Sequence, residues 1–259
     1  SAASDVYKRQ TFDYIFNKTE AITLEQSKLT LSKDITVLSF SDSSMVDRNS
    51  SIIKVDSGWI VYSKNSESSI LSFTSDGQFS GYIGHRGNGP GEYTSVYDVV
   101  VNQKSKVLEV LSDGGIFCYT FGGDFLDKKE VTYPAFSFAI DDRQNYWFYV
   151  GNNTTYGDAK MICTDENIAN VAYYLHQKSN MLPMVENNFG RNGEWLTFHE
   201  SLNHDLYTIE NGKLDLSYAM DFPNYKLPKK LHELSGMEVI EELQRSNLSL
   251  IHISEPTRP

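Results

Sequence analysis

Positive charge, cysteine and long apolar runs are all scarce in this chain of 259 residues. Lys and Arg number 23 against 34 Asp and Glu, a formal net charge of −11, which argues against a nucleic-acid-binding surface. No apolar run approaches the roughly 20 residues that a membrane-spanning helix needs. What is plentiful is aromatic: 16 Tyr and 14 Phe within a hydrophobic fraction of 40% favour a strand-rich, core-forming protein.

An internal repeat organises most of the chain. Four copies are read at residues 52–84, 96–131, 137–175 and 188–222. Their turn markers Gly77, Gly123, Asn167 and Gly212 lie 46, 44 and 45 residues apart, a period typical of propeller blades. Each copy contains four short strands joined by tight turns, which predicts a four-stranded antiparallel sheet. The sequence therefore predicts an all-β propeller, with about four blades present.

The region after the fourth repeat departs from this pattern. Between residues 226 and 245, Pro228 precedes an apolar spacing of three residues that is typical of one helical face, although Gly236 weakens it. We expect a short amphipathic helix inserted here, packing against the core rather than binding a partner.

The two ends of the chain look foreign to it. Residues 1–10, SAASDVYKRQ, and residues 248–259, which include LSLIHISEPTR, resemble the two strands of a transposon sequencing adapter read in frame. We therefore expect the natural segment to be residues 11–247 of a metagenomic fragment, with a non-native tail at each end.

The segment that leaves the first repeat carries a family resemblance. Residues 82–93 read YIGHRGNGPGEY, which resembles the glycine-rich signature of NHL-type propellers, most closely a six-bladed family of bacterial envelope proteins. That resemblance implies six blades, of which four are present, a periplasmic or cell-surface location, and a lipid anchor in a missing N-terminus. It also implies that residues 28–40 form the strand that closes the ring by pairing into the last blade.

This loop supplies the candidate ligand contacts. His85 and Arg86 are polar residues on a crossover between blades, where binding residues gather. They are the first candidates, and Glu92 and Tyr93 are the next. We assign the remaining signature residues to the turn itself: Gly84, Gly87, Gly89, Pro90 and Gly91. A dinucleotide-binding loop is disfavoured because a strand follows and Pro90 has no N–H.

Other candidates receive structural interpretations. Trp59, Trp147 and Trp195 share one position in their repeats and are expected in the core between blades rather than on a sugar-binding platform. By counting back from the turn markers, Cys118 and Cys163 should face opposite ways and remain free thiols. No catalytic constellation, metal site or cofactor motif is recognised.

Two functional classes remain open, with a third beside them. The first is a non-catalytic binding or scaffolding propeller of the cell envelope, with a small molecule, glycan or protein bound over the central channel on the side of the crossover loops. The rival is a propeller enzyme, a lyase or hydrolase, with its site at the channel mouth. A pure interaction module, docking through the acidic surface and the C-terminal helix, is the third.

Overall fold

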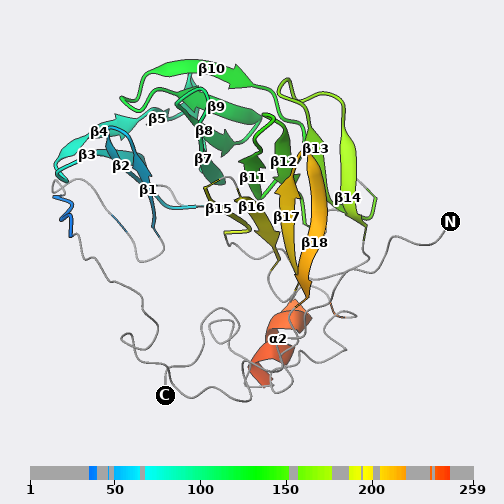
Figure 1. Cartoon of the computed structure of the whole chain (residues 1–259). Helices are drawn as coiled ribbons and strands as arrows, with labels where there is room; N and C mark the ends of the chain where they lie inside the picture. The colour runs from blue at the N-terminus through cyan, green and yellow to red at the C-terminus, as the bar shows by residue number, and fades with distance from the viewer. Residues whose placement is uncertain are drawn as a thin grey trace, which may run out of the picture.

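A computed structural model describes residues 35–39, 46, 50–64, 68–151, 157–176, 187–193, 195–200, 205–219, 234 and 237–245. The strands form four antiparallel sheets of four strands each in a propeller arrangement, together with one two-stranded pair (Figure 1). The all-β propeller fold predicted from the repeat is confirmed. No helix in the described part of the chain is long and apolar enough to cross a membrane.

Each sheet is one blade, and its strands follow the chain from the inner edge to the outer edge. Blade 1 consists of β1 (Ser51–Val55), β2 (Gly58–Tyr62), β3 (Ile70–Thr74) and β4 (Phe79–Ile83). Blade 2 consists of β7 (Asp98–Asn102), β8 (Val107–Ser112), β9 (Gly115–Tyr119) and β10 (Phe125–Lys129). Between them, β5 (His85–Arg86) and β6 (Glu92–Tyr93) form a short parallel pair within the crossover loop.

The next two blades repeat the arrangement. Blade 3 consists of β11 (Ser137–Ile140), β12 (Tyr146–Tyr149), β13 (Ala159–Thr164) and β14 (Ala172–His176). Blade 4 consists of β15 (Phe189–Asn192), β16 (Trp195–His199), β17 (Asp205–Glu210) and β18 (Lys213–Ala219). The helix α2 (Met237–Arg245) lies inside the predicted range 226–245. Residues 226–233, 235 and 236 lie outside the described residues, as do residues 1–34 and 246–259.

The turn between the third and fourth strands is built in the same way in three blades. Its first residue is Thr74, Thr120 or Asp165, whose side-chain oxygen accepts the backbone N–H four residues later. Such side-chain bonds are why Thr and Asp favour turns. The residue three positions after it turns back at positive φ, which is 90° at Gly77, 100° at Gly123 and 59° at Ile168. In blade 3, therefore, Ile168 occupies the glycine position.

This turn corrects the expected orientation of the two cysteines. Cys118 and Cys163 each lie two residues before the first turn residue, so they occupy equivalent positions. Cys118 packs between blades 2 and 3, and Cys163 packs between blades 3 and 4. Both therefore face the following blade, and the prediction that they face opposite ways is wrong because Asn167 was taken as the marker in place of Ile168. Both thiols are free and buried.

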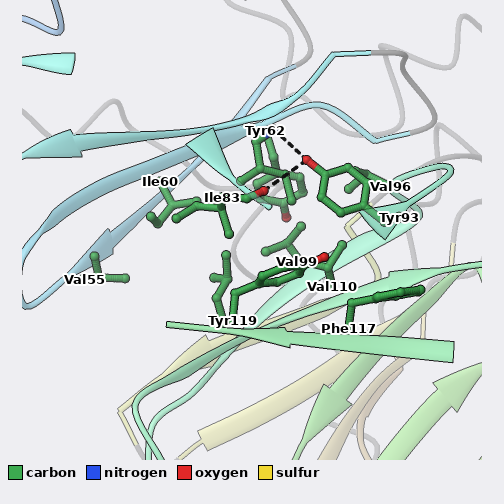
Figure 2. Close-up of a cluster of buried hydrophobic side chains, with 12 residues drawn as sticks. Val55, Ile60, Tyr62, Ile83, Tyr93, Val96, Val99, Val110, Phe117 and Tyr119 are labelled. Atoms are coloured by element: carbon green, nitrogen blue, oxygen red, sulfur yellow. Dashed lines mark hydrogen bonds between the residues drawn. The ribbon is translucent and has the colours of Figure 1, made fainter. Parts of the chain in front are cut away.

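Apolar side chains fill the spaces between blades. Figure 2 shows the cluster between blades 1 and 2, to which Ile60 of β2 and Val110 of β8 both contribute. Alternate residues of each strand point to opposite faces of a sheet. A blade that has a neighbour on each side, such as blade 2 or blade 3, therefore contributes one set of side chains to the cluster before it and another to the cluster after it. The core is thus a series of interblade layers.

The three tryptophans do not share one environment. Trp147 is fully buried and donates its indole N–H to Asp141 Oδ2 at 3.0 Å, as expected for a core residue. Trp59 is half-buried beside the cluster on the other face of blade 1. Trp195 is 68% exposed, so the described blades do not place it in an interblade core, and that assignment stays a prediction. It lies on the face of blade 4 that points away from blade 3, where no described residue covers it.

Residues 35–39 lie against blade 1 in a way that repeats an interblade contact. Ser39 N–H donates to Gly77 O at 2.8 Å, next to the turn of blade 1. At the next interface, Gly84 N–H at the end of β4 donates to Gly123 O at 3.4 Å. Relative to blade 1, residues 35–39 therefore stand where β4 stands relative to blade 2.

Candidate functional site

The inner strands of the blades surround a cavity of about 360 Å³. Each of β1, β7, β11 and β15 contributes to its lining, and these four strands lie on the inner side of the arc of blades (Figure 1). The inner strands of a propeller face its central channel. The cavity is therefore the channel of the described blades, with an apolar wall that includes Ile53, Val99 and Ile140.

One polar residue from each blade gathers at one end of this channel. They are Ser51, Asp98, Ser137 and Asn188. Each stands in the same register at the start of its inner strand, opposite Tyr62, Leu111, Tyr149 and His199 respectively on the second strand. Because the chain enters each inner strand from a crossover loop, this polar ring lies at the mouth on the crossover-loop side.

Asp98 is the most heavily bonded member of the polar ring. Its Oδ1 accepts from Lys64 Nζ at 2.8 Å and from the Val99 N–H at 2.9 Å, and its Oδ2 accepts from the Phe138 N–H at 3.0 Å. The side chains of Asp98 and Lys64 are only 8% and 10% exposed. Burial raises the pKa of Asp98, although the Lys64 ammonium and the two N–H donors oppose that rise. A desolvated, paired carboxylate in a cavity wall is typical of functional sites.

The ring continues between blades 3 and 4. Ser137 Oγ donates to Asn188 Oδ1 at 2.8 Å, and Asn188 Nδ2 donates to His199 O at 3.2 Å. Ser137 and Asn188 are both buried. Polar contacts therefore join neighbouring blades around the channel mouth: Lys64 with Asp98, Asp98 with the Phe138 N–H, and Ser137 with Asn188.

Arg191 lies further along the channel on β15. Its guanidinium donates to Ile140 O on the neighbouring inner strand. Burial lowers the pKa of Arg191, while the carboxylates of Asp141 and Asp142 act in the opposite direction. The channel thus presents an ammonium at its mouth, a guanidinium deeper along the strands, and hydrogen-bonding groups between them.

The crossover loop of residues 84–93 lies elsewhere, against the outer strands of blade 2. Tyr119 on β9 donates its hydroxyl to Gly91 O at 2.8 Å, and a side chain at Gly84 would collide with the Tyr119 ring. His85 and Arg86 are exposed, and Arg86 Nε donates to Thr94 O at 2.8 Å. None of these loop residues lines the channel cavity, so the structure does not bring His85 and Arg86 to the polar ring.

Glu92 and Tyr93 serve contacts inside the loop. Glu92 Oε2 accepts the Gly89 N–H at 2.8 Å, and a Cβ at Gly87 would stand 1.9 Å from the same oxygen. Tyr93 is fully buried; its hydroxyl donates to Ile83 O and accepts the Ile70 N–H, both at 3.2 Å. Figure 2 shows this hydroxyl bridging two strands of blade 1. A ligand could reach Tyr93 only by opening that packing.

The turn residues of the loop have two different reasons for being glycine. Gly84 and Gly91 adopt φ values of 60° and 74°, a region that side chains disfavour. Gly87 and Gly89 instead make room for the carboxylate of Glu92. Pro90 is exposed at the tip.

Sequence reasoning missed Asp98 and Lys64, yet a signal for Asp98 was present. Asp98 is the single charged residue in the run VYDVVV, and a carboxylate in a buried strand requires a charged or hydrogen-bonding partner. Lys64 lies just after β2 in a polar stretch, and nothing in the pattern distinguishes it from a solvated lysine.

Among the described residues, no group of three or more His, Cys, Asp or Glu side chains is arranged to hold a metal ion. The molecule is thus a β-propeller with a polar ring at the mouth of its channel. Its sequence matches a family described as a domain of unknown function, DUF4934, over residues 8–255. The chain belongs to this family. The match extends into both end segments for which a foreign origin was predicted, and that origin stays a prediction.

Solved structures share the fold at low sequence identity. A Bacteroides fragilis NCTC 9343 protein that is described as exported has 14% identity and a TM-score of 0.65, with 84% of this chain and 61% of the other covered. A member of the DUF4221 family from Bacteroides vulgatus ATCC 8482 has 12% identity and a TM-score of 0.55, with 84% and 70% covered. A streptogramin B lyase has 18% identity, a TM-score of 0.47, and 74% and 59% covered.

This chain therefore spans about three fifths of the length of the exported B. fragilis protein. No curated protein matches the chain in sequence.

Proposed function

We propose that this protein is a non-catalytic, ligand-binding propeller of the bacterial cell envelope, and that it binds a short saccharide in the channel cavity. The observation that carries the proposal is the polar ring, because Ser51, Asp98 and Asn188 stand at the same register around one cavity, and Ser137 of the remaining blade holds the Asn188 amide in place. Ligand sites combine an apolar wall with a few convergent polar groups, and the channel has both. The envelope location is supported by the exported B. fragilis protein that shares the fold.

A saccharide suits the chemistry of the ring. Asp98 and Asn188 offer planar carboxylate and amide groups that can bond two neighbouring hydroxyls, and the Ser51 hydroxyl also lines the cavity. The apolar wall formed by the inner strands can cover the C–H face of a sugar ring. The cavity of about 360 Å³ is within the usual range of roughly 300 to 1,000 Å³ for small-molecule sites.

The experiment is an oligosaccharide panel measured by thermal shift and then by calorimetry. Asp98→Asn should weaken binding of any hit by at least about tenfold, because an amide is a poorer acceptor and its N–H₂ faces the Lys64 ammonium. Asp56→Asn is the matched control, since the Asp56 side chain is 78% exposed and outside the cavity; its affinity should equal that of the unaltered protein. Equal affinities in all three proteins would overturn the channel as the site.

The same experiment separates binding from catalysis. Incubating the bound saccharide with the protein and following it by mass spectrometry should return it unchanged. A product that is smaller or lacks one water would instead establish the lyase or hydrolase alternative.

We further propose that the four blades belong to a six-bladed ring closed through the N-terminal segment. The support is the position of residues 35–39, which stand beside blade 1 as β4 stands beside blade 2. A segment in that place is the outer strand of a blade whose other strands come from elsewhere in the protein. The stability of Gly77→Ala, compared with that of Gly123→Ala, tests this arrangement.

A further inference from the structure

A second cavity, of about 390 Å³, lies between blades 2 and 3 and shares no lining residue with the channel. Blade 2 lines it with its first turn and with side chains from β8, β9 and β10. Blade 3 lines it with Gln144, Tyr146, Glu166 and Asn167. We call this cavity the interblade crevice. Nothing in the proposed saccharide site uses it.

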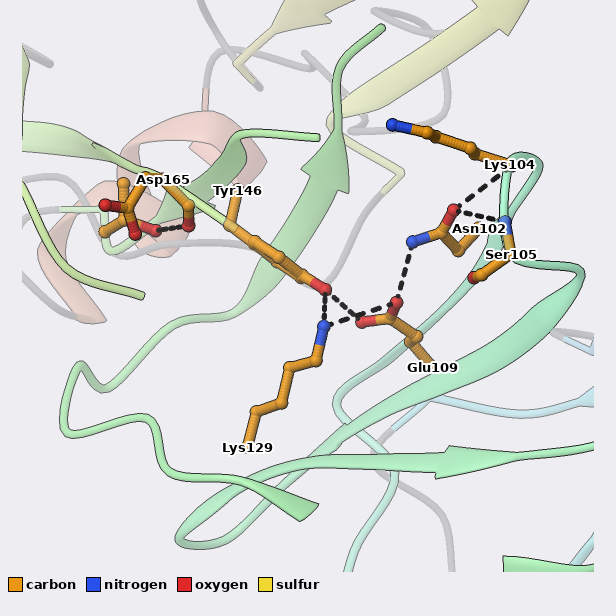
Figure 3. Close-up of polar contacts among 8 residues, drawn as sticks. Asn102, Lys104, Ser105, Glu109, Lys129, Tyr146 and Asp165 are labelled. Atoms are coloured by element: carbon orange, nitrogen blue, oxygen red, sulfur yellow. Dashed lines mark hydrogen bonds and ion pairs between the residues drawn. The ribbon is translucent and has the colours of Figure 1, made fainter. Parts of the chain in front are cut away.

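Its floor is a buried pair. Glu109 and Tyr146 are each 1% exposed, and the Tyr146 hydroxyl donates to Glu109 Oε2 at 2.7 Å. Asn102 Nδ2 donates to the other carboxylate oxygen at 3.0 Å. The nearby Asn102 oxygen receives two backbone N–H groups of its own turn, from Lys104 and Ser105, which fixes the amide in this orientation (Figure 3).

A lysine from the outer strand already places a cation on this floor. Lys129 Nζ lies 4.7 Å from the centre of the Tyr146 ring and 3.9 Å from Glu109 Oε1, and it also contacts the Tyr146 hydroxyl oxygen (Figure 3). An aromatic face beside a carboxylate is the arrangement that binds ammonium groups. Lys129 belongs to the exposed edge strand β10, and its side chain is 29% exposed.

The charge of the crevice exceeds what Lys129 balances. Three carboxylates line it, those of Glu109, Asp127 and Glu166, against the single ammonium of Lys129. Glu166 is exposed at the rim, as is Asp127, and neither forms an ion pair with another described residue. Leu126, which is 51% exposed, adds an apolar surface beside them.

We propose that the interblade crevice binds a linear organic diammonium ion, a molecule of the polyamine class. One ammonium pairs with the rim carboxylates of Asp127 and Glu166, the methylene chain covers Leu126, and the second ammonium approaches the Tyr146 and Glu109 floor in competition with Lys129. Such a ligand would occupy the space beside Lys129, and its two positive charges would balance the two surplus negative charges. Burial and the Glu109 charge raise the pKa of Tyr146, so its hydroxyl stays protonated and neutral beside the cation.

The test is calorimetric titration with putrescine at low and moderate salt. The unaltered protein should bind putrescine, and Lys129→Met should bind about tenfold more tightly, because it removes the competing ammonium while keeping a side chain of similar length. Glu166→Gln should bind about tenfold more weakly. Since Glu166 is an exposed turn residue, this variant tests the proposal even if Lys129→Met fails to fold.

Lys128→Met is the matched control. Lys128 is the neighbour of Lys129 on β10, but its ammonium lies over Phe117 and pairs with Glu130, outside the crevice. Its affinity for putrescine should stay within about twofold of the unaltered protein. Asp98→Asn should also leave putrescine binding unchanged, which keeps this outcome separate from that of the saccharide site. Absence of binding, or equal binding by the Lys129, Lys128 and Glu166 variants, would overturn the proposal.

Discussion

The interface between blades 1 and 2 and the interface between blades 3 and 4 share one frame but differ in chemistry. The first is filled by apolar side chains and by the hydroxyl of Tyr93, which bonds only to backbone groups, and its ion pair of Lys64 with Asp98 lies at the channel mouth. The second contains a buried ion pair, in which Lys160 Nζ lies 3.1 and 3.2 Å from the two oxygens of Glu200. Tyr149 donates to the same carboxylate at 2.9 Å. The repeat thus fixes the direction in which side chains point, whereas the types of residue that fill each interface differ.

The largest expected loss in the free energy of unfolding comes from a substitution at Lys160, in the interface between blades 3 and 4. Lys160→Met leaves the carboxylate of Glu200 buried without its cation, and breaking such a pair costs about 3 to 5 kcal/mol. Urea denaturation should show this loss in the free energy of unfolding. The double variant Lys160→Met/Glu200→Leu should recover most of it, because no charge is then left buried; an equally unstable double variant would contradict the explanation.

A third interface, between residues 35–39 and blade 1, extends the comparison. A Cβ at Gly77 would lie 2.1 Å from Val37 O, and a Cβ at Gly123 would lie 2.4 Å from Tyr82 O. Both glycines have positive φ, so each Ala variant should lose about 1 to 3 kcal/mol. We expect similar losses for Gly77→Ala and Gly123→Ala in thermal denaturation. A clearly smaller loss for Gly77→Ala than for Gly123→Ala would show that residues 35–39 are not held like an outer strand, because only the cost of positive φ would then remain at Gly77.

Tyr93→Phe addresses the apolar interface with a smaller change. It keeps the ring but removes the hydroxyl that serves Ile70 N–H and Ile83 O. Leaving these buried groups without a partner should cost about 1 to 2 kcal/mol, measured by urea denaturation. Because no charge is involved, the loss should not depend on salt, whereas a strongly salt-dependent loss would mean that the interface is less apolar than its contacts indicate.

The smallest effect belongs to an ion pair at the outer edge of blade 3. His176 Nδ1 lies 2.9 Å from Asp158 Oδ1, and this hydrogen bond raises the pKa of His176. The protonated form is favoured in the folded state, so its contribution to stability is complete below about pH 6.5 and is lost as the pH rises through the raised pKa. NMR titration should show that Asp158→Asn lowers the pKa of His176; an unchanged pKa would remove Asp158 as the cause.

The part of the fold that follows from local patterns could be predicted from the sequence. Turn residues and strand alternation repeat along the chain, so the four-stranded blades could be predicted from the sequence. The orientation of Cys163 was not, because Ile168 takes a backbone conformation normally left to glycine and displaces the apparent marker by one residue. An isoleucine gives no local signal that it will do so.

The residues that line the two cavities could be predicted from the sequence less well than the fold. His85 and Arg86 were chosen because they lie on a conspicuous loop, yet the channel is lined by side chains of the inner strands. Asp98 and Glu109 are single carboxylates in otherwise apolar strand segments, VYDVVV and VLEVLS, and both are buried in cavity walls. Isolated charge within a strand pattern would have pointed to the two cavities, while the prediction that His85 and Arg86 contact a ligand stays a prediction. Lys64 becomes a neighbour of Asp98 only when blades 1 and 2 pack, and Lys129 of β10 reaches Glu109 of β8 across the sheet of blade 2.

The polar ring has a consequence for how this family can diversify. Each blade supplies one ring position where its inner strand begins, and the apolar interblade clusters are built from other residues. Under the proposed function, substitutions at Ser51 and Asn188, which line the cavity, would change what the channel binds while the blade frame persists, with Asp98 and Lys64 exchanged together. Relatives could acquire new specificities by this route, and a display library randomised at these positions would select for them.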